Sequence, residues 1–138
     1  MQQTLKLHHI GVATRGINKE LEIFAKLGYE RCSEIFEDHI QKMKGVFIKA
    51  PNQPCLELIE GIGEQNPVKS HVLKGNKFYH FAYETKNIKK DMENFVKNYN
   101  AKVIVPITTA TYFDKICFLL LPNMMIIELV QVKVLKNE

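Results

Sequence analysis

The sequence contains no tryptophan, only two arginines and only three cysteines in 138 residues. Arg15 and Arg31 lie among scattered lysines, without a basic stripe that alternates with aromatic residues, so no nucleic-acid partner is expected. The odd number of cysteines and the absence of a CxxC spacing argue against a disulfide framework and a cysteine-based zinc site. Cys32, Cys55 and Cys117 each lie in a strand-like stretch, and we expect them to be buried, reduced thiols.

Long apolar runs are missing as well. The longest, residues 116–121, is far shorter than the roughly 20 apolar residues that cross a bilayer, so no membrane partner is expected. The first residues lack the charged and then apolar layout of a signal peptide. We therefore expect a soluble, cytoplasmic protein whose net charge of +4 suits an anionic small molecule.

The residues that are present are typical of a folded domain, with 46% hydrophobic and 25% charged side chains. Their periodicity predicts an α+β fold in which the order strand–helix–strand–strand–strand occurs twice. Asn18 is the expected N-cap of the first helix, Gly28 is expected to end it, and residues 105–113 are expected to form an ordinary connection. The expected strands are residues 7–14, 29–36, 44–49, 55–60, 78–85, 102–106, 115–121 and 125–132, and the expected helices are residues 19–27, 68–73 and 88–99.

A self-comparison indicates that the chain is a duplication. Adding 71 to a residue number in the first half reaches a matching residue in the second half, mostly an apolar one. Two of the matches are polar, because His9 falls on His80 and Glu57 falls on Glu128. We therefore predict one domain, residues 1–138, made of two modules at about residues 5–62 and 76–133 that share a two-fold symmetric site.

These four polar residues form a candidate metal site. Strand alternation turns each of them away from the helix-packed face, so they would converge if each half curls into a half-barrel. Two imidazoles and two carboxylates suit a divalent ion, with Ni, Co, Zn, Mn and Mg all left open. Such an ion stabilises an enolate oxygen while a neighbouring carboxylate removes the α-proton. The alternative is that the histidines are hydrogen-bonded core residues and the glutamates face solvent, but the shared offset and parity favour a metal site.

The other histidines carry no such signal. His8 is expected to face the helix and to be structural, whereas His39 and His71 are expected on the surface.

Five segments resemble one known family: HHIGVAT at 8–14, LELIEG at 56–61, NPVKSHVL at 66–73, YHFAYE at 79–84 and IIELVQ at 126–131. They resemble the vicinal oxygen chelate superfamily (glyoxalase/bleomycin resistance/dioxygenase), which includes glyoxalase I, methylmalonyl-CoA epimerase and the extradiol dioxygenases. The resemblance covers nearly the whole chain. It implies two tandem βαβββ modules that form a cleft in a curved mixed sheet, with His9, Glu57, His80 and Glu128 as ligands of a divalent metal ion.

The segments NPVKSHVL and YHFAYE resemble the epimerase-like and glyoxalase I-like branch. This resemblance implies a metal-dependent lyase or isomerase that removes an α-proton and stabilises an enediolate, with Glu128 as the base and Glu57 as its symmetric counterpart. We expect a glyoxalase I-like reaction (lactoylglutathione lyase type) on a thiol hemithioacetal. LLLPNMMIIEL nevertheless lacks the Asp-Pro-Asp-Gly approach of many glyoxalases.

Two alternatives remain open. The first is racemisation of an acyl thioester, as in methylmalonyl-CoA epimerase, which uses a second acid on the strand before the Glu57 strand. Our register puts Ile40 at that position, with Gln41 adjacent and Glu37 and Asp38 further back. The second alternative is a non-catalytic small-molecule-binding or resistance protein of the same fold. A homodimer is also left open, because this fold often dimerises.

Overall fold

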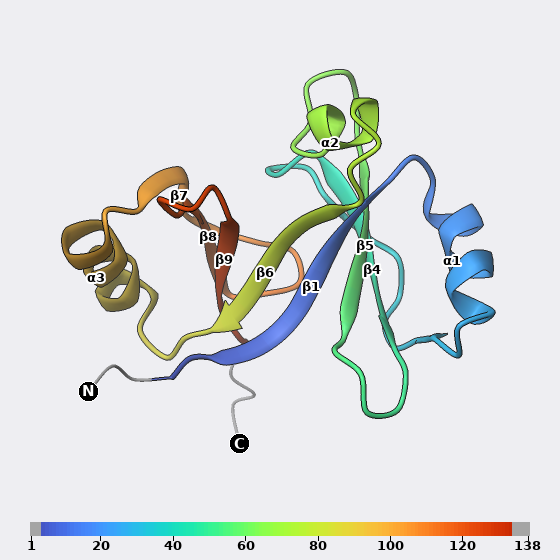
Figure 1. Ribbon diagram of the computed structural model, residues 1–138, viewed down its shortest axis with the longest axis horizontal. Helices are drawn as coiled ribbons and strands as arrows, with labels where there is room; N and C mark the ends of the chain where they lie inside the picture. Colours follow the sequence, from blue (N-terminus) through green and yellow to red (C-terminus); the bar gives the residue numbers. More distant parts are fainter. Residues whose placement is uncertain (1–3, 134–138) are drawn as a thin grey trace. The chain divides into compact units, whose positions relative to one another are not determined.

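The structure is a computed structural model that describes residues 4–133 (Figure 1). Its contacts divide these residues into two compact units. We call residues 9–79 the first unit, and residues 4–8 with 80–133 the second unit. The elements are Lys6–Thr14 (β1), Ile17–Ala25 (α1), Glu30–Arg31 (β2), Phe36–Asp38 (β3), Met43–Lys49 (β4), Leu56–Gly61 (β5), Lys69–Leu73 (α2), Phe78–Glu84 (β6), Ile88–Tyr99 (α3), Lys102–Thr109 (β7), Lys115–Leu120 (β8) and Ile126–Gln131 (β9).

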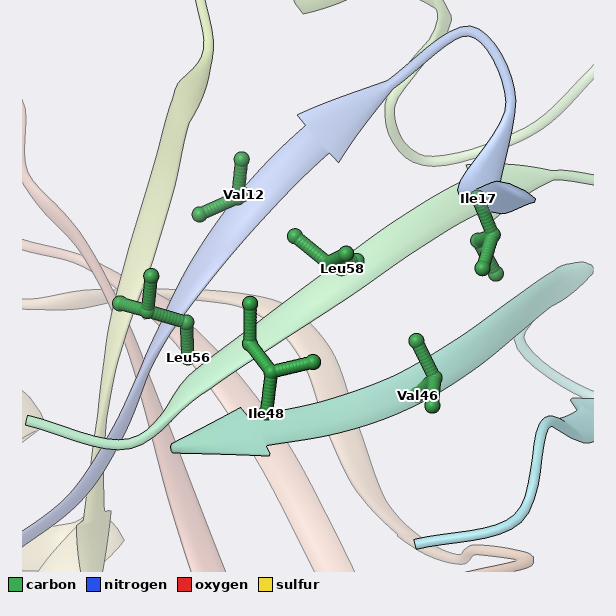
Figure 2. Packing of buried hydrophobic residues seen from close by; sticks show 6 residues of the cluster. All are labelled: Val12, Ile17, Val46, Ile48, Leu56 and Leu58. Carbon is green, nitrogen blue, oxygen red and sulfur yellow. The ribbon is translucent and has the colours of Figure 1, made fainter. Parts of the chain in front are cut away.

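The first unit has strands in the order β2-β4-β5-β1, with β3 also paired to β4. β1 runs parallel to β5, and β4 runs antiparallel to β5. Side chains on one face of these strands pack with the start of α1 into an apolar cluster (Figure 2). Burial of each such side chain contributes about 1.5–3 kcal/mol, which fixes this face of the strands against the helix. The cluster consists of Val12, Ile17, Val46, Ile48, Leu56 and Leu58.

The second unit has strands in the order β6-β9-β8-β7. β6 runs parallel to β9, and β8 runs antiparallel to both β9 and β7. Met92 and Phe95 of α3 pack against buried Cys117, Ile127 and Leu129. The helix thus covers one face of these strands, as α1 does in the first unit.

The predicted repeat extends to the registers of the strands. Ile10 pairs with Leu56 in the first unit, and Phe81 pairs with Ile127 in the second, so both members of the pair shift by 71. The duplication read from the sequence therefore describes strand pairing as well as residue type.

The hydrogen bond made by the first residue of the helix is also repeated in the two units. The backbone N–H of Ile17 donates to the Glu60 carboxylate at 3.0 Å, and that of Ile88 donates to the Gln131 side-chain oxygen at 3.3 Å. Both donors and both acceptors are related by the offset of 71. In each unit the last strand therefore supplies an acceptor to a helix N–H that has no partner within the helix.

Two local predictions for the first unit are wrong. The strand expected at 29–36 is divided into β2 and β3, because the backbone N–H of Phe47 donates to the Ser33 hydroxyl instead of to a backbone carbonyl. Asn18 is not the N-cap of the first helix. Gly16 takes that position, without a side-chain cap, and the helix begins at Ile17 rather than at residue 19. Gly28, with a φ of +95°, follows the helix as predicted, although the helix ends at Ala25, two residues before the predicted end, and Lys26 is its C-cap.

The expectation for residues 105–113 is also wrong in part, since β7 continues to Thr109. Pro106 lies within this strand, which is tolerated because β7 is last in the strand order and its pairing with β8 shifts register between Val105 and Thr108. Within residues 4–133, no helix combines the length and the apolar character needed to cross a membrane.

Candidate functional site

The first candidate pair lies in the first unit. Ile10 and Val12 of β1 pack toward α1, so strand alternation turns His9 to the opposite face. There its Nε2 lies 3.0 Å from Oε1 of Glu57 on β5, and both side chains are buried. Gly11 is the register partner of Glu57, which makes the histidine and the glutamate diagonal neighbours across a residue without a side chain.

The second unit contains the equivalent pair. Nε2 of His80 on β6 lies 3.1 Å from Oε1 of Glu128 on β9, and both side chains are again buried. The register partner of Glu128 is Ala82, which has the same position after His80 as Gly11 has after His9. The structure thus brings together His9 with Glu57 and His80 with Glu128, in one geometry and between small residues.

Each histidine ring also contacts a phenylalanine. Phe47 meets His9 edge-to-face, with ring centroids 5.0 Å apart, and Phe118 meets His80 in the same way at 5.2 Å. Phe47 is paired with Glu57 across β4 and β5, and Phe118 with its glutamate across β8 and β9. These phenylalanines were not among the predicted site residues. The signal was present, because they too are related by the offset of 71, but an apolar match reads as an ordinary core contact.

The pairs fit the ligand geometry of a divalent ion. Two ligand atoms that each lie about 2.1 Å from an ion, at right angles around it, are about 3 Å apart. The observed separations of 3.0 Å and 3.1 Å between imidazole nitrogen and carboxylate oxygen match this value. A mixed nitrogen and oxygen donor set of this kind suits first-row divalent metals and zinc. Each pair therefore has the donors and the spacing of two adjacent metal ligands.

The surroundings of the two glutamates differ. Beside Glu57, the β4 position one step further along the same face is Gly45, and a methyl group placed there would lie 3.0 Å from Oε2 of Glu57. The same methyl group would lie 2.6 Å from Cζ of Phe36. In the second unit the position equivalent to Gly45 is the fully buried Ile116.

The three cysteines are free thiols, but only Cys117 is fully buried. Burial, and after it the charge of Glu128, raises the pKa of the Cys117 thiol to about 12. Burial also raises the pKa of the half-buried Cys55 to about 12, with smaller contributions from the Cys32 thiol and the Glu57 carboxylate. The expectation of a buried thiol is wrong for Cys32, which is exposed because it follows the two-residue strand β2.

The remaining histidines lie apart from the two pairs. His8 is half-buried and meets Phe113 edge-to-face, at a centroid distance of 5.0 Å. His39 is exposed, as predicted, and its Nε2 lies 3.2 Å from a carboxylate oxygen of Glu37. His71 is half-buried rather than exposed, because its ring packs against Tyr79.

The segment that would hold a second acid combines an exposed turn with one buried carboxylate. Ile40, which our sequence register places at the position of the second acid, is 63% exposed in the turn between β3 and β4. Asp38 is buried, and its carboxylate accepts hydrogen bonds from the backbone N–H and the side-chain amide of Gln41, at 3.0 Å and 2.8 Å. It lies on the same face of β3 as Phe36, since the two residues are separated by one position.

The sequence of the chain matches the family described as the glyoxalase/bleomycin resistance protein/dioxygenase superfamily over residues 8–118. The chain belongs to this superfamily. The resemblance found in the sequence is thereby confirmed. A search among curated proteins finds no match.

Solved structures share the superfamily fold. A hypothetical protein from Bacillus halodurans is similar with a TM-score of 0.81 and 22% identity, over 99% of this chain and 100% of that chain. Methylmalonyl-CoA epimerase from Mycobacterium tuberculosis gives 0.82 and 16% identity, over 97% and 94%. A variant of the Streptomyces coelicolor epimerase, in complex with 2-nitronate-propionyl-CoA, gives 0.78 and 20%, over 95% and 100%. These likenesses confirm the predicted α+β vicinal oxygen chelate fold.

Proposed function

We propose that His9, Glu57, His80 and Glu128 together hold one divalent metal ion. The observation that supports this is the repetition of the His–Glu pair, with nitrogen–oxygen separations of 3.0 Å and 3.1 Å. One pair alone supplies two ligands, whereas protein sites for such ions supply three or four. Two equivalent pairs, related by a duplication, would complete the set.

We infer that the protein is a metal-dependent isomerase or lyase acting on the proton next to a carbonyl group. A divalent ion would act as a Lewis acid and stabilise the negative charge on the substrate oxygen. Glu128 would take the proton as general base, and the small Gly11 and Ala82 would leave room for the substrate. His9 and His80 would hold the site in place, because each imidazole is fixed by a phenylalanine contact.

The reaction that fits best is glyoxalase I-like isomerisation of a thiol hemithioacetal. In that reaction one base moves a proton between adjacent carbons, so a single carboxylate suffices. Epimerisation of an acyl-CoA needs an acid on each face of the α-carbon, and Ile40 occupies the expected position of the second one. The exposed turn around Ile40 therefore favours one-base chemistry.

One observation favours the acyl-CoA epimerase as the second candidate. Asp38 is a buried acid on β3, two residues before Ile40, and it could serve as the second base if Gln41 released its carboxylate. Several structures of similar fold are methylmalonyl-CoA epimerases, one of them in complex with methylmalonyl-CoA.

Two measurements test the proposal. The first is calorimetric titration of chelator-treated protein with nickel, cobalt, zinc, manganese and magnesium. Failure to bind any of them would overturn the metal site. The second compares loss of a methylglyoxal–thiol hemithioacetal with deuterium uptake at the α-carbon of methylmalonyl-CoA.

The variant Glu128→Gln should abolish turnover while the circular dichroism spectrum stays unchanged, and Asp38→Asn should impair only the acyl-CoA reaction. Metal binding without either reaction would support a non-catalytic binding protein instead of the enzyme.

A further inference from the structure

Each unit has a cavity beside the first turn of its helix, with a volume of about 430 Å³ in the first unit and about 650 Å³ in the second. Three basic side chains line each cavity, and the two sets are related by the offset of 71. They are Lys77, Arg15 and Lys19 in the first unit, and Lys6, Lys86 and Lys90 in the second. The duplication thus repeats a set of three positive charges around a cavity, as well as the His–Glu pair.

The acidic side chains around the two cavities differ. In the second unit, Glu84 pairs with Lys6 at 3.6 Å, and Asp91 also lines the cavity. The residue that corresponds to Glu84 in the first unit is Ala13, so Glu20 is the one acid among the lining residues there. Three cations and one acid leave a charge of +2 around the first cavity, whereas three cations and two acids leave +1 around the second.

The acid of the first cavity is already occupied by one of the three cations. The carboxylate of Glu20 is buried and accepts a hydrogen bond from Nζ of Lys77. Arg15 and Lys19 are exposed, and neither of them forms an ion pair within residues 4–133. The Arg15 guanidinium donates only to the backbone carbonyl of Val72, at 3.5 Å. Two positive charges of the lining are therefore without an opposite charge.

Unopposed positive charges around a cavity attract an anion. A cleft lined by one sign of charge focuses the electric field and raises the local concentration of the opposite ion. The planar guanidinium of Arg15 has donors that match the oxygens of a phosphate in pairs, and the ammonium of Lys19 adds a point charge. A phosphate ester carries about −1.5 to −2 charges at pH 7, which matches the +2 of the lining.

The rest of the lining includes apolar side chains. Ile23 of α1 is 48% exposed at the cavity, and Val72 of α2 also lines it. The volume of about 430 Å³ lies within the range of about 300–1,000 Å³ that is usual for small-molecule sites. An inorganic ion would leave Ile23 in contact with water. The cavity therefore suits a phosphate that carries an apolar organic group.

We infer that the first-unit cavity binds a small organic phosphate. The phosphate lies between Arg15 and Lys19, and the organic part lies against Ile23 and Val72. The inference goes beyond the proposed function, because the site uses none of the four candidate metal ligands. Ala13, the lining residue on β1, is four residues beyond His9, or about 13 Å along the strand.

The test is an NMR titration of the isotope-labelled protein with phenyl phosphate. The protein is first treated with a chelator, so that the phosphate has no metal ion to bind, and the titration is repeated after addition of zinc. We expect saturable shifts of backbone amides centred on residues 13–23 and 72–77 in both cases. Inorganic phosphate should bind roughly tenfold more weakly, because it lacks the apolar group, and phenol should not bind, because it lacks the charge.

Variants of the lining identify the groups that bind. Arg15→Gln and Lys19→Gln should each weaken the binding of phenyl phosphate by roughly tenfold, because each removes a charge-assisted contact. Lys86→Gln is the matched control, since it removes one positive charge at the position equivalent to Arg15, and it should leave the affinity unchanged. Ile23→Ala should reduce the preference for phenyl phosphate over inorganic phosphate.

Coenzyme A is the second probe, and it distinguishes two sources of the phosphate. Competition between coenzyme A and phenyl phosphate at residues 13–23 would assign the phosphate to a thiol carrier. Binding of phenyl phosphate without such competition would assign it to a separate small molecule, and both results support the inference.

Four results would overturn the inference. They are the absence of saturable shifts at millimolar phenyl phosphate, shifts centred on the cavity of the second unit, equal losses in Arg15→Gln and Lys86→Gln, and binding only in the presence of zinc. None of them concerns the affinity of the protein for a metal ion, so the proposed function is tested separately.

Discussion

The two units place a histidine and a glutamate with the same offset, the same register and nearly the same distance, yet they surround the two glutamates differently. His9 and Glu57 are separated by 3.0 Å, and their counterparts in the second unit by 3.1 Å. Gly45 lies beside Glu57, whereas the fully buried Ile116 has the equivalent position in the second unit. The identical positions are those that would hold an ion. The residues that differ lie beside the carboxylates and are not among the four candidate ligands.

The largest effect should come from the two histidines. His9→Ala and His80→Ala should each lower the affinity for a divalent ion by at least about 100-fold, at the upper end of outer-shell changes or beyond it, and abolish turnover. Equal losses are expected because the two pairs have the same geometry. Calorimetric titration measures the affinity, and His39→Ala, which changes an exposed histidine, is the control. A loss of affinity in only one of the two variants would show that the two His–Glu pairs are not equivalent.

The cysteines allow a comparison by chemical reactivity. Because the thiolate is the reactive form, the pKa of about 12 keeps Cys117 almost entirely protonated at pH 8. Iodoacetamide should therefore modify the exposed Cys32 of the first unit at least about 1,000 times faster than Cys117 of the second unit. Mass spectrometry of peptides from timed reactions measures both rates. Addition of urea should remove the protection of Cys117, and rapid modification in the native protein would contradict its burial.

Equivalent substitutions in the apolar clusters of the two units should lower the free energy of unfolding by the same amount. Leu58 and Leu129 are related by the offset of 71, and both are 0% exposed in the cluster under their own helix. Leu58→Ala and Leu129→Ala should each lower the free energy of unfolding by about 2–5 kcal/mol. Urea denaturation followed by circular dichroism gives both values. Each substitution leaves a cavity in its cluster. If the two losses in free energy of unfolding differ by more than about half of this range, one cluster relaxes into its cavity and the other does not.

The two His–Glu pairs of the candidate site could be predicted from the sequence because they depend on strand alternation and on a duplication. The constant separation between histidine and glutamate predicts one arrangement in both halves, and in the structure each glutamate pairs with the residue two positions after its histidine, Gly11 or Ala82. The helix predicted at 88–99 has these bounds in the structure, where the Asn87 side chain accepts a hydrogen bond from the backbone N–H of Lys90. Local signals of this kind are readable without knowledge of tertiary contacts.

The features that were missed depend on contacts between distant residues. Ser33 interrupts the expected strand at 29–36 through a bond to Phe47, fourteen positions away. The α1 start is set by Glu60 on β5, so the N-cap preference of Asn18 had no influence. The close approach of the Phe36 ring to Gly45 is likewise a contact between strands. A residue type alone predicts none of these, because each requires knowing which strand lies beside which.

Both units have a hydrogen bond from the first residue of the helix to a side chain of the last strand, and this bond can be tested by replacing its acceptor. Glu60→Ala should cost about 1–2 kcal/mol, because the backbone N–H of Ile17 loses its acceptor and the charge near the helix N-terminus is lost. Gln131→Ala should cost less, about 0.5–1 kcal/mol, because the equivalent bond from Ile88 is longer and its acceptor is neutral. Glu60→Gln, which imitates the second unit, should fall between the unchanged protein and Glu60→Ala. Urea denaturation measures all three, and a larger cost for Gln131→Ala would reverse the predicted order.

The smallest effect concerns the caps themselves. Asn87 accepts a hydrogen bond from the backbone N–H of Lys90, whereas Gly16 offers α1 no side-chain acceptor. The backbone at Gly16 is extended, with a φ of −162°, and a side chain there would meet nothing within 4 Å. Gly16→Asn should therefore add a few tenths of a kcal/mol from the cap, with a similar gain from a less flexible unfolded chain, or about 0.5 kcal/mol in total.

The controls for this last change separate its two sources. Gly16→Ala restricts the unfolded chain without supplying an acceptor, so it should be less stable than Gly16→Asn, and Asn87→Gly should lose a few tenths of a kcal/mol. Differences of this size shift the melting temperature by about 1–3 °C and can be measured by differential scanning calorimetry. If the asparagine and alanine variants at residue 16 melt together, a side-chain cap adds nothing at α1. The Glu60 carboxylate would then be a full substitute for the cap that Asn87 gives α3, and the two units would reach the same helix start by different chemistry.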